Sequence, residues 1–472
     1  MTFYFFPETI MLLIGLTGCA LGAFKLRLVS RAGTAIGLIA VSAACIVLVY
    51  SKTSFGGGAV FVQDPLQIIG RVLILLSTGF LFLIYFHYFN KQYAVPGLSV
   101  ALILIASSAW MIASGADDII LYFVCFNVAG LSTAVLTSLG ERGSAARHSA
   151  LALFKYFGSI SALLVFGAVL LYTAYGTTDC SVLEHMTGEG RTTVSILATV
   201  GLVFVITGLA GIYGLFPFYY WLPNTAHSLP VPVIDYLMIV PRIATMIFLM
   251  RLFVLNHIFF DASIYILIAV LAVVTMTSAQ VTMYAQTNIR LLILYASFVH
   301  GAYMMVGLVS GFPNGIEAGI LYMIIFVFSF LGISSIMALL NTETEDVFNI
   351  AWAGMARKQM VVGLGFMVII ASLAAVPLTG GFVGIFFLCT TALTAQYRWL
   401  VIAVLGTVFI GIVMYAKMIK TAFFYEPVSQ KPVTLQPNRI LIMGICAGML
   451  VLLGIFPEPF LSLISYLISW YR

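Results

Sequence analysis

Two opposite charges lie within one apolar segment of the chain. Asp235 and Arg242 stand seven residues apart in residues 231–255, which read VPVIDYLMIVPRIATMIFLMRLFVL. Seven residues are about two helical turns, so both side chains project from the same face of one helix. A carboxylate near a guanidinium could load and release protons, or the two charges could cancel. A charge inside hydrocarbon costs at least ~2.5–3.5 kcal/mol, so the pair predicts a polar route or a neutralised site within an apolar protein.

The composition indicates the class of protein that must position these charges. Hydrophobic residues make up 62% of the 472 residues and charged residues only 8%. Apolar segments long enough to cross about 30 Å of hydrocarbon recur along the whole chain. A β-barrel is excluded because its strands would alternate apolar and polar residues. The sequence predicts an all-α, polytopic membrane protein with about fourteen transmembrane helices: 5–24, 32–50, 66–88, 95–114, 119–139, 149–174, 194–222, 231–255, 262–283, 289–310, 315–340, 360–394, 399–424 and 437–456.

Motifs for metal, phosphate or redox chemistry are missing from the sequence. The six cysteines form no CxxC pair and read as small buried hydrophobes: Cys19, Cys45, Cys125, Cys180, Cys389 and Cys446. Neither a glycine-rich phosphate loop nor an HExxH motif occurs. We therefore expect no metal site and no cofactor in this chain.

The distribution of basic residues predicts the orientation of the chain in the membrane. With both termini outside, the inner loops carry thirteen Lys and Arg residues: Lys25, Arg27, Arg31, Lys91, Arg142, Arg147, Arg290, Arg357, Lys358, Lys417, Lys420, Lys431 and Arg439. The outer side carries only four: Lys52, Arg191, Arg398 and Arg472. The positive-inside rule therefore places both termini on the outer side.

Two of the predicted spans are interrupted in the same way. Residues 209–223 read LAGIYGLFPFYYWLP, with Pro217 in mid-membrane. Residues 372–387 read SLAAVPLTGGFVGIFF, with Pro377 followed by two glycines. Proline removes a backbone donor and clashes with the preceding turn, so each span should divide into two half-helices. Paired broken helices are typical of transporters built from inverted repeats, although membrane helices also tolerate single breaks.

At these residues the chain resembles the antiporter-like membrane subunits of respiratory complex I, membrane-bound hydrogenases and Mrp-type antiporters. The most specific block is FPFYYWLPNTAHSLPVPV at residues 216–233. Supporting blocks are LFKYF at 153–157, MRLF at 250–253, and PLTGGFVG at 377–384. Within that superfamily, the sequences of these blocks are most similar to those of subunit N of complex I. The resemblance implies two inverted five-helix repeats with broken helices 7 and 12.

Compared with the family, this sequence departs at the residues that carry protons. By the resemblance, a Glu and three further titratable residues, mostly Lys, form the central proton route. Their positions here hold Asn127, Ile212, Arg242 and Ile385. Asparagine and isoleucine do not titrate, and arginine stays charged because its pKa is above about 12.

Two interpretations follow from these departures. In one, other groups replace the lost residues, namely Asp235, Tyr213, Lys155, His300 and Lys417. In the other, Asp235 and Arg242 form a static pair, and the proton route is degenerate or impaired. We favour the second interpretation. Water molecules along a proton route need polar partners, and apolar residues such as Ile212 and Ile385 provide none.

Several of these residues also have ordinary structural interpretations. Lys155 could anchor its span at the interface, and His300 could be a hydrogen-bonded core residue. Arg71 and Arg251 lie near span ends, where we expect them to reach toward the membrane interface.

The sequence as a whole predicts a subunit-N-like membrane subunit of a proton-translocating NADH:quinone oxidoreductase, with a structural or coupling role. The predicted organisation is an N-terminal three-helix part (1–94), a first repeat (95–257), a second repeat (258–424) and a C-terminal helix (425–472). By the resemblance, NADH, FMN, iron–sulfur clusters and quinone belong to partner subunits, in a bacterial cytoplasmic membrane. The alternatives are an Mrp-type cation/proton antiporter subunit and a membrane-bound hydrogenase subunit.

Overall fold

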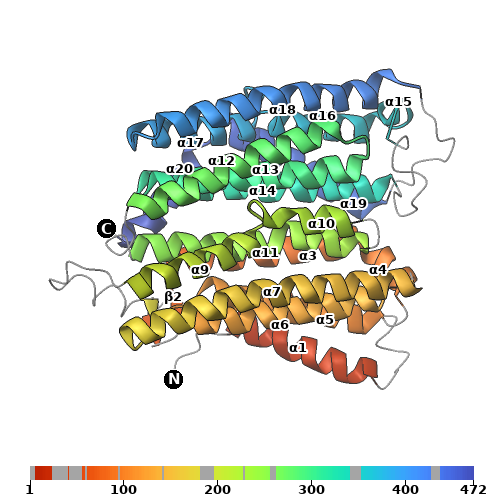
Figure 1. The fold of residues 1–472 in the computed structure, drawn as a ribbon. Coiled ribbons are helices and arrows are strands. Elements are labelled where there is room, and N and C mark those ends of the chain that lie inside the picture. Colours follow the sequence, from red (N-terminus) through yellow and green to blue (C-terminus); the bar gives the residue numbers. More distant parts are fainter. Residues whose placement is uncertain are drawn as a thin grey trace. The chain divides into compact units, whose positions relative to one another are not determined.

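The computed structural model is a set of long helices (Figure 1). It describes residues 6–23, 41, 56–58, 61–93, 96–140, 143–180, 196–226, 229–255, 262–340, 352–426 and 436–471. The chain falls into two compact units. Unit 1 comprises residues 1–214 and 218–261, and unit 2 comprises residues 215–217 and 262–472.

Unit 1 contains helices that run back and forth between two ends. They are α1 (Phe6–Ala23), α3 (Pro65–Ile84), α4 (Phe86–Gln92), α5 (Pro96–Ser114), α6 (Ile119–Ser138), α7 (Gly143–Tyr175), α9 (Ile196–Tyr213), the single turn η1 (Phe218–Tyr220), α10 (Trp221–Thr225) and α11 (Val231–Leu255). A short antiparallel hairpin, β1 (Gly56–Gly58) and β2 (Phe61–Gln63), precedes α3.

Local sequence explains where several of these helices begin. Asp64 is the N-cap of α3, and its carboxylate accepts a hydrogen bond from the Gln67 N–H, while Pro65 fills the first helical position. Asp118 caps α6 in the same way, accepting from the Ile120 N–H. Both caps satisfy backbone donors that a helix start would otherwise leave unpaired.

Unit 2 is built from a second series of helices. They are α12 (Ala262–Ala285), α13 (Ile289–Ser310), α14 (Asn314–Leu339), α15 (Met355–Lys358), α16 (Met360–Leu373), α17 (Gly380–Thr394), α18 (Arg398–Phe424), α19 (Pro437–Ile455), α20 (Glu458–Ile468) and the turn η3 (Ser469–Tyr471).

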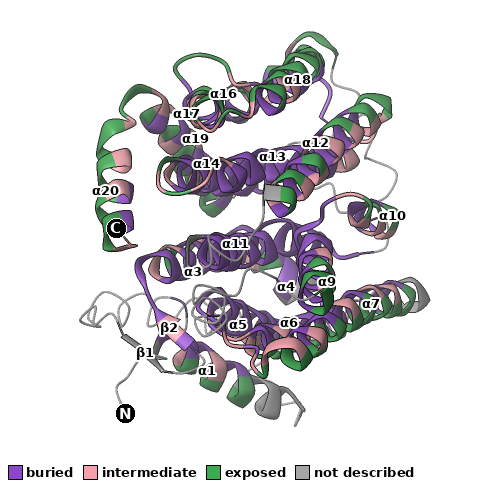
Figure 2. Ribbon diagram, turned by 60° about the vertical axis from the view of Figure 1, so that its left-hand side comes forward, coloured by how far each residue is buried: buried purple, intermediate pink, exposed green. Residues whose placement is uncertain are grey.

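Each unit has its own buried helices. In unit 1, α11 is buried along its length, whereas much of α7 is exposed (Figure 2). The exposed residues of α7 include the large apolar Phe154 and Tyr172. In unit 2, α13 and α14 are buried and α18 exposes apolar side chains such as Phe409. Such apolar outer faces suit a hydrocarbon solvent and not water.

The predicted all-α, polytopic fold is confirmed. Eleven described helical segments are long and apolar enough to cross a membrane, and three shorter apolar helices accompany them. Thirteen of the predicted spans coincide with described helices, whereas 32–50 falls almost entirely outside the described residues. The hairpin β1–β2 and the eleven-residue α20 were not predicted, because both are too short to give a spanning signal. The predicted division at 257/258 stays a prediction; the two units divide at 261/262.

Candidate functional site

The first broken helix ends in the interior of unit 1. Helix α9 stops at Tyr213, and Gly214 follows in the left-handed region at φ +85°. The chain then passes through a cis Phe216–Pro217 bond into η1 and α10. The break expected at Pro217 is therefore present. A helix that ends inside the protein leaves carbonyl groups that need donors.

Two side chains from other helices supply those donors. Arg242 of α11 is 3% exposed and donates from Nε to the Tyr213 carbonyl at 3.2 Å. The Tyr156 hydroxyl of α7 donates to the Gly211 carbonyl at 2.8 Å and to the Phe218 carbonyl at 3.1 Å. The C-terminus of a helix carries a partial negative charge, so a guanidinium there is electrostatically favourable. Arg242 thus holds a permanent positive charge at the point where α9 is interrupted.

Asp235 contacts a different part of unit 1. Its Oδ2 accepts a hydrogen bond from the Tyr85 hydroxyl, at the junction of α3 and α4, over 2.5 Å. The neighbouring Tyr236 hydroxyl lies 3.1 Å from the Ser107 hydroxyl of α5. Asp235 is therefore directed to the end of α3 and Arg242 to the end of α9. The static pair expected between them stays a prediction.

The positions without titratable chemistry are occupied by packed or hydrogen-bonded groups. Asn127 of α6 donates to the Phe123 carbonyl and accepts from the Ser161 hydroxyl of α7 at 3.0 Å. Ile212 is 9% exposed, next to Tyr213 at the end of α9. Ile385 of α17 in unit 2 is 6% exposed. Neither isoleucine offers a hydrogen bond to a water molecule in its surroundings.

The second broken helix lies in unit 2. Helix α16 ends at Leu373 and α17 begins at Gly380, so the break expected at Pro377 is present. Two residues of the break, Ala375 and Leu378, adopt positive φ angles of 53° and 70°. The Gly381 N–H donates to the Ser372 hydroxyl at 3.0 Å, which ties the start of α17 to the end of α16.

His300 is the centre of an aromatic hydrogen-bonded group in unit 2. Its Nδ1 lies 2.6 Å from the Tyr322 hydroxyl of α14 and its Nε2 lies 2.9 Å from the Tyr415 hydroxyl of α18. The Tyr303 ring packs edge-on against it, and the Tyr303 hydroxyl donates to Thr407 at 3.0 Å. Both ring nitrogens therefore have partners, as a hydrogen-bonded core histidine requires.

Lys155 and Lys417 lie on the surface of the chain. Lys155 is exposed on α7 in unit 1, and Lys417 is exposed on α18 in unit 2. Neither side chain is drawn into the buried hydrogen-bonded groups described above.

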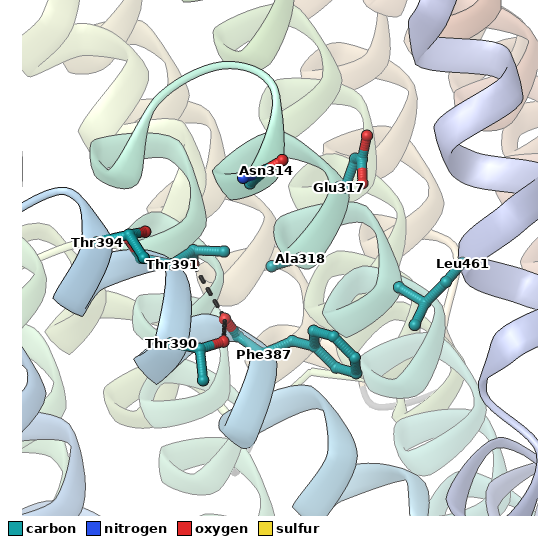
Figure 3. Close-up of a pocket in the computed structure, with 8 residues that line it drawn as sticks. All are labelled: Asn314, Glu317, Ala318, Phe387, Thr390, Thr391, Thr394 and Leu461. Carbon is teal, nitrogen blue, oxygen red and sulfur yellow. Dashed lines mark hydrogen bonds between the residues drawn. The ribbon is translucent and has the colours of Figure 1, made fainter.

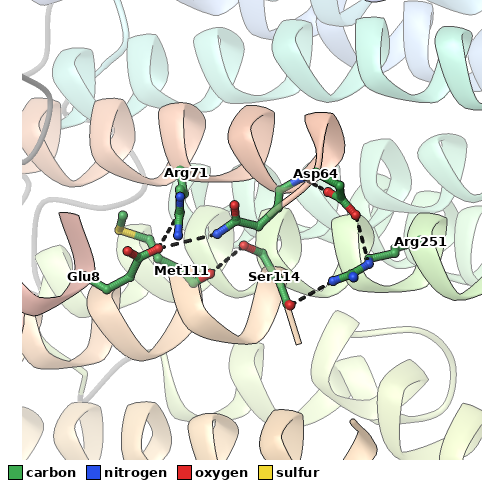
Figure 4. Close-up of polar contacts among 8 residues, drawn as sticks. Glu8, Asp64, Arg71, Met111, Ser114 and Arg251 are labelled. Carbon is green, nitrogen blue, oxygen red and sulfur yellow. Dashed lines mark hydrogen bonds and ion pairs between the residues drawn. The ribbon is translucent and has the colours of Figure 1, made fainter. Parts of the chain in front are cut away.

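Arg71 and Arg251 do not reach toward the membrane interface, and this expectation was wrong. They are 1% and 2% exposed and form buried ion pairs (Figure 4). The Arg71 Nε lies 2.5 Å from a Glu8 oxygen, and the Arg251 Nε lies 2.9 Å from an Asp64 oxygen. Hydropathy places a residue near a span end but does not tell which charges on other helices share that end. Asp117 lies 3.6 Å from Arg251 and is the fifth charged residue of this buried group.

Comparison with known proteins identifies the family. Residues 116–411 match the family model described as NADH:quinone oxidoreductase/Mrp antiporter, TM. The chain belongs to this family. It is a multi-pass membrane member, with the broken helices and the long apolar helices described above.

Curated relatives cover most of the chain. The chain is 26% identical to NADH-quinone oxidoreductase subunit N of Methylovorus glucosotrophus, over 89% of this chain and 87% of that protein. It is 27% identical to NAD(P)H-quinone oxidoreductase subunit 2 of Synechococcus elongatus, over 97% of this chain and 90% of that protein.

Solved structures share the family fold. A chain of respiratory complex I from Thermus thermophilus superposes with a TM-score of 0.80 at 20% identity, covering 97% of this chain and 98% of that chain. A chain of the Mrp complex from a Dietzia species superposes with a TM-score of 0.84 at 16% identity, covering 99% and 97%. At these identities the likeness establishes the fold.

Proposed function

We propose that this chain is the subunit-N-type membrane subunit of an NADH:quinone oxidoreductase in a bacterial cytoplasmic membrane. The observation that carries the proposal is the pair of curated relatives named subunit N and subunit 2, which match 89% and 97% of the chain. NADH oxidation, flavin and iron–sulfur chemistry and quinone reduction would then take place in partner subunits. An Mrp-type antiporter subunit and a membrane-bound hydrogenase subunit are the alternatives.

Co-purification tests this assignment directly. An affinity tag on this chain should bring down subunits with NADH-oxidising and quinone-reducing activity from gently solubilised membranes. Recovery of a nickel hydrogenase or of Mrp partner subunits in their place would contradict the assignment and select one of the alternatives.

We further propose that the subunit's own proton route is impaired and that its role is structural or coupling. Arg242 supports this proposal, because its guanidinium keeps its charge and is hydrogen-bonded to the end of α9. The packed side chains of Ile212 and Ile385 support it as well, since a chain of water needs polar partners. Titratable groups such as Asp235 and His300 are held by tyrosine hydroxyls.

The proton-to-electron ratio of the intact complex tests the second proposal. We expect the double variant Asp235→Asn with Arg242→Gln to leave this ratio unchanged once assembly is verified by subunit content. The matched control is Tyr85→Phe, which removes only the hydroxyl that donates to Asp235. A lower ratio in an assembled double variant would mean that the route is retained through substitute residues.

A further inference from the structure

A group of buried charges lies at the end of unit 1 where α1 and α3 begin and α11 ends (Figure 4). We refer to Glu8, Asp64, Arg71, Asp117 and Arg251 as the end cluster. All five side chains are buried, at 1–5% exposure. Three carboxylates face two guanidinium groups, so the described residues of the cluster carry one surplus negative charge. Burying such a surplus is unfavourable unless a proton or a cation offsets it.

Both oxygens of the Asp64 carboxylate have a partner, one through a hydrogen bond and the other through an ion pair without hydrogen-bond geometry. One oxygen accepts from the Gln67 N–H at 2.7 Å as the cap of α3, and the other pairs with the Arg251 Nε at 2.9 Å. Arg251 also donates to the carbonyls of Gly115 and Ala116, at 2.8 and 3.2 Å. The Asp64 carboxylate is thus matched by a cation, Arg251, that lies within ion-pair distance.

Glu8 is satisfied on one side only. Its Oε1 accepts from the Arg71 Nε at 2.5 Å and from the Gln67 Nε2 at 3.5 Å. Its Oε2 is buried and has no hydrogen-bond partner among the described residues, and the same is true of the Gln67 Oε1. Two oxygens of side chains that contact each other thus accept nothing, although buried polar atoms are nearly always hydrogen-bonded. What the site lacks is a donor.

We propose that Glu8 is a proton-binding site, at which Oε2 takes up one proton and the resulting carboxylic acid can donate to the Gln67 amide oxygen. The proton comes from water at this end of the chain and returns to it, and only the O–H bond forms and breaks. The Arg71 guanidinium keeps its hydrogen bond to Oε1 in both states. Protonation removes the surplus negative charge of the end cluster and supplies the missing donor.

Among the described elements around Glu8, Arg71 is the charged residue that faces the Glu8 carboxylate. Gln67 and Arg71 stand one turn apart on α3, so both reach the same carboxylate. The guanidinium of Arg71 also lies 5.6 Å from the centre of the Phe61 ring of β2. Helix α5, which packs along α1, contains no ionisable residue. No second cation on these elements competes with a proton at Oε2.

The site includes none of the family positions Asn127, Ile212, Arg242 and Ile385. It would give unit 1 a protonatable group at its end while its centre keeps a fixed charge. Its use in proton transfer rests on the proposed function, but its protonation does not.

Infrared difference spectroscopy on the purified membrane complex tests the proposal. Lowering the pH from about 8 to about 5 should raise a carboxylic-acid carbonyl band that is completely lost in Glu8→Gln. The matched control is Glu317→Gln, which alters a half-buried carboxylate of unit 2 held by the Ser465 hydroxyl and should leave the band in place. A water molecule that donates to both oxygens would keep Glu8 ionised, so an absent band, or one unchanged in Glu8→Gln, would overturn the proposal.

A second measurement tests the proposal even if the Glu8→Gln variant does not assemble. In complex labelled with carbon-13 at glutamate side-chain carboxyls, the native band should shift, whereas the band of Glu8→Asp should not. Gln67→Leu should change the frequency of the native band, because the acid loses its acceptor. The band is measured in whichever complex co-purifies with the chain, so an error in the assignment to quinone oxidoreductase would leave this result intact.

Discussion

Arg242 shows how one side chain can fix a charge at a helix break. The guanidinium donates to the last carbonyl of α9, where the helix dipole favours a cation. A lysine at such a point could lose its proton when a neighbouring charge moves, whereas an arginine keeps its charge. An arginine can therefore stabilise the helix break and keep a fixed charge there, in line with the impaired proton route that we propose.

The end cluster shows the other use of arginine, as a partner for buried carboxylates. Arg251 contacts Asp64 and Asp117, all at low exposure. Removing one partner of a buried ion pair leaves an uncompensated charge, which costs about 3–5 kcal/mol. Arginine is suited to this place because its planar group can bond carboxylates and the carbonyls of Gly115 and Ala116 together.

We expect Arg251→Met to lower the melting temperature and the yield of the assembled complex strongly, in line with a loss of about 3–5 kcal/mol. The matched control is Arg398→Met at the exposed start of α18, which should change stability by less than about 0.5 kcal/mol. Thermal unfolding followed by tryptophan fluorescence gives both values. Equal melting temperatures for the two variants would show that the Arg251 pairs are weak.

At the scale of elements, the broken helices are positioned by close backbone contacts. A side chain at Gly381 would collide with the carbonyl of Ser372, and one at Gly454 would collide with the carbonyl of Leu378. The break of α16 and α17 thus requires glycine on two helices. In the other unit, the break after α9 is instead satisfied by Arg242 and Tyr156.

Gly381→Ala should destabilise the second break by about 1–3 kcal/mol, because the new methyl group forces backbone apart. Gly406→Ala in α18 is the matched control, since nothing lies within 4 Å of its added Cβ. Alanine in an open helix position is favourable by up to about 1 kcal/mol, so the control should not lose stability. The melting temperatures of the two assembled variants are compared. If Gly381→Ala is as stable as the control, the close contact at Gly381 does not require glycine.

At the scale of the whole molecule, the distribution of charge predicts the orientation of the chain in the membrane. Basic residues are concentrated in the loops on one side, which predicts that both termini lie on the outer side. Alkaline phosphatase, which becomes active only outside the cytoplasmic membrane, should therefore be active when fused after Tyr471. A fluorescent protein that matures in the cytoplasm provides the complementary fusion, and bright fluorescence at the C-terminus would reverse the orientation.

The helices themselves were predictable to within a few residues. The bounds expected for 231–255 and 289–310 are those of α11 and α13, because apolar length and the flanking residues define a span. The helix breaks were predictable as well, since proline cannot continue the backbone hydrogen bonds. The short α20 and the hairpin before α3 gave no comparable signal.

The site was predictable only in part. The residue types at Asn127, Ile212 and Arg242 were enough to question a proton route, since type alone decides whether a side chain titrates. The partners of Asp235 and Arg251 were not predictable, because they lie on helices far away in the sequence. Charged residues at span ends, such as Glu8 beside Pro7 and Arg251, were the available signal for the end cluster.

What the sequence determined by itself is the class of the molecule and which of its side chains can titrate. Hydrophobic length fixes the spanning helices, and residue type fixes which groups can hold a proton. Only the tertiary structure decided which charges meet, because packing of helices distant in the chain brings Glu8 to Arg71 and Arg251 to Asp64. Inside an apolar protein, that choice of partner decides whether a charge is neutralised, fixed or free to change.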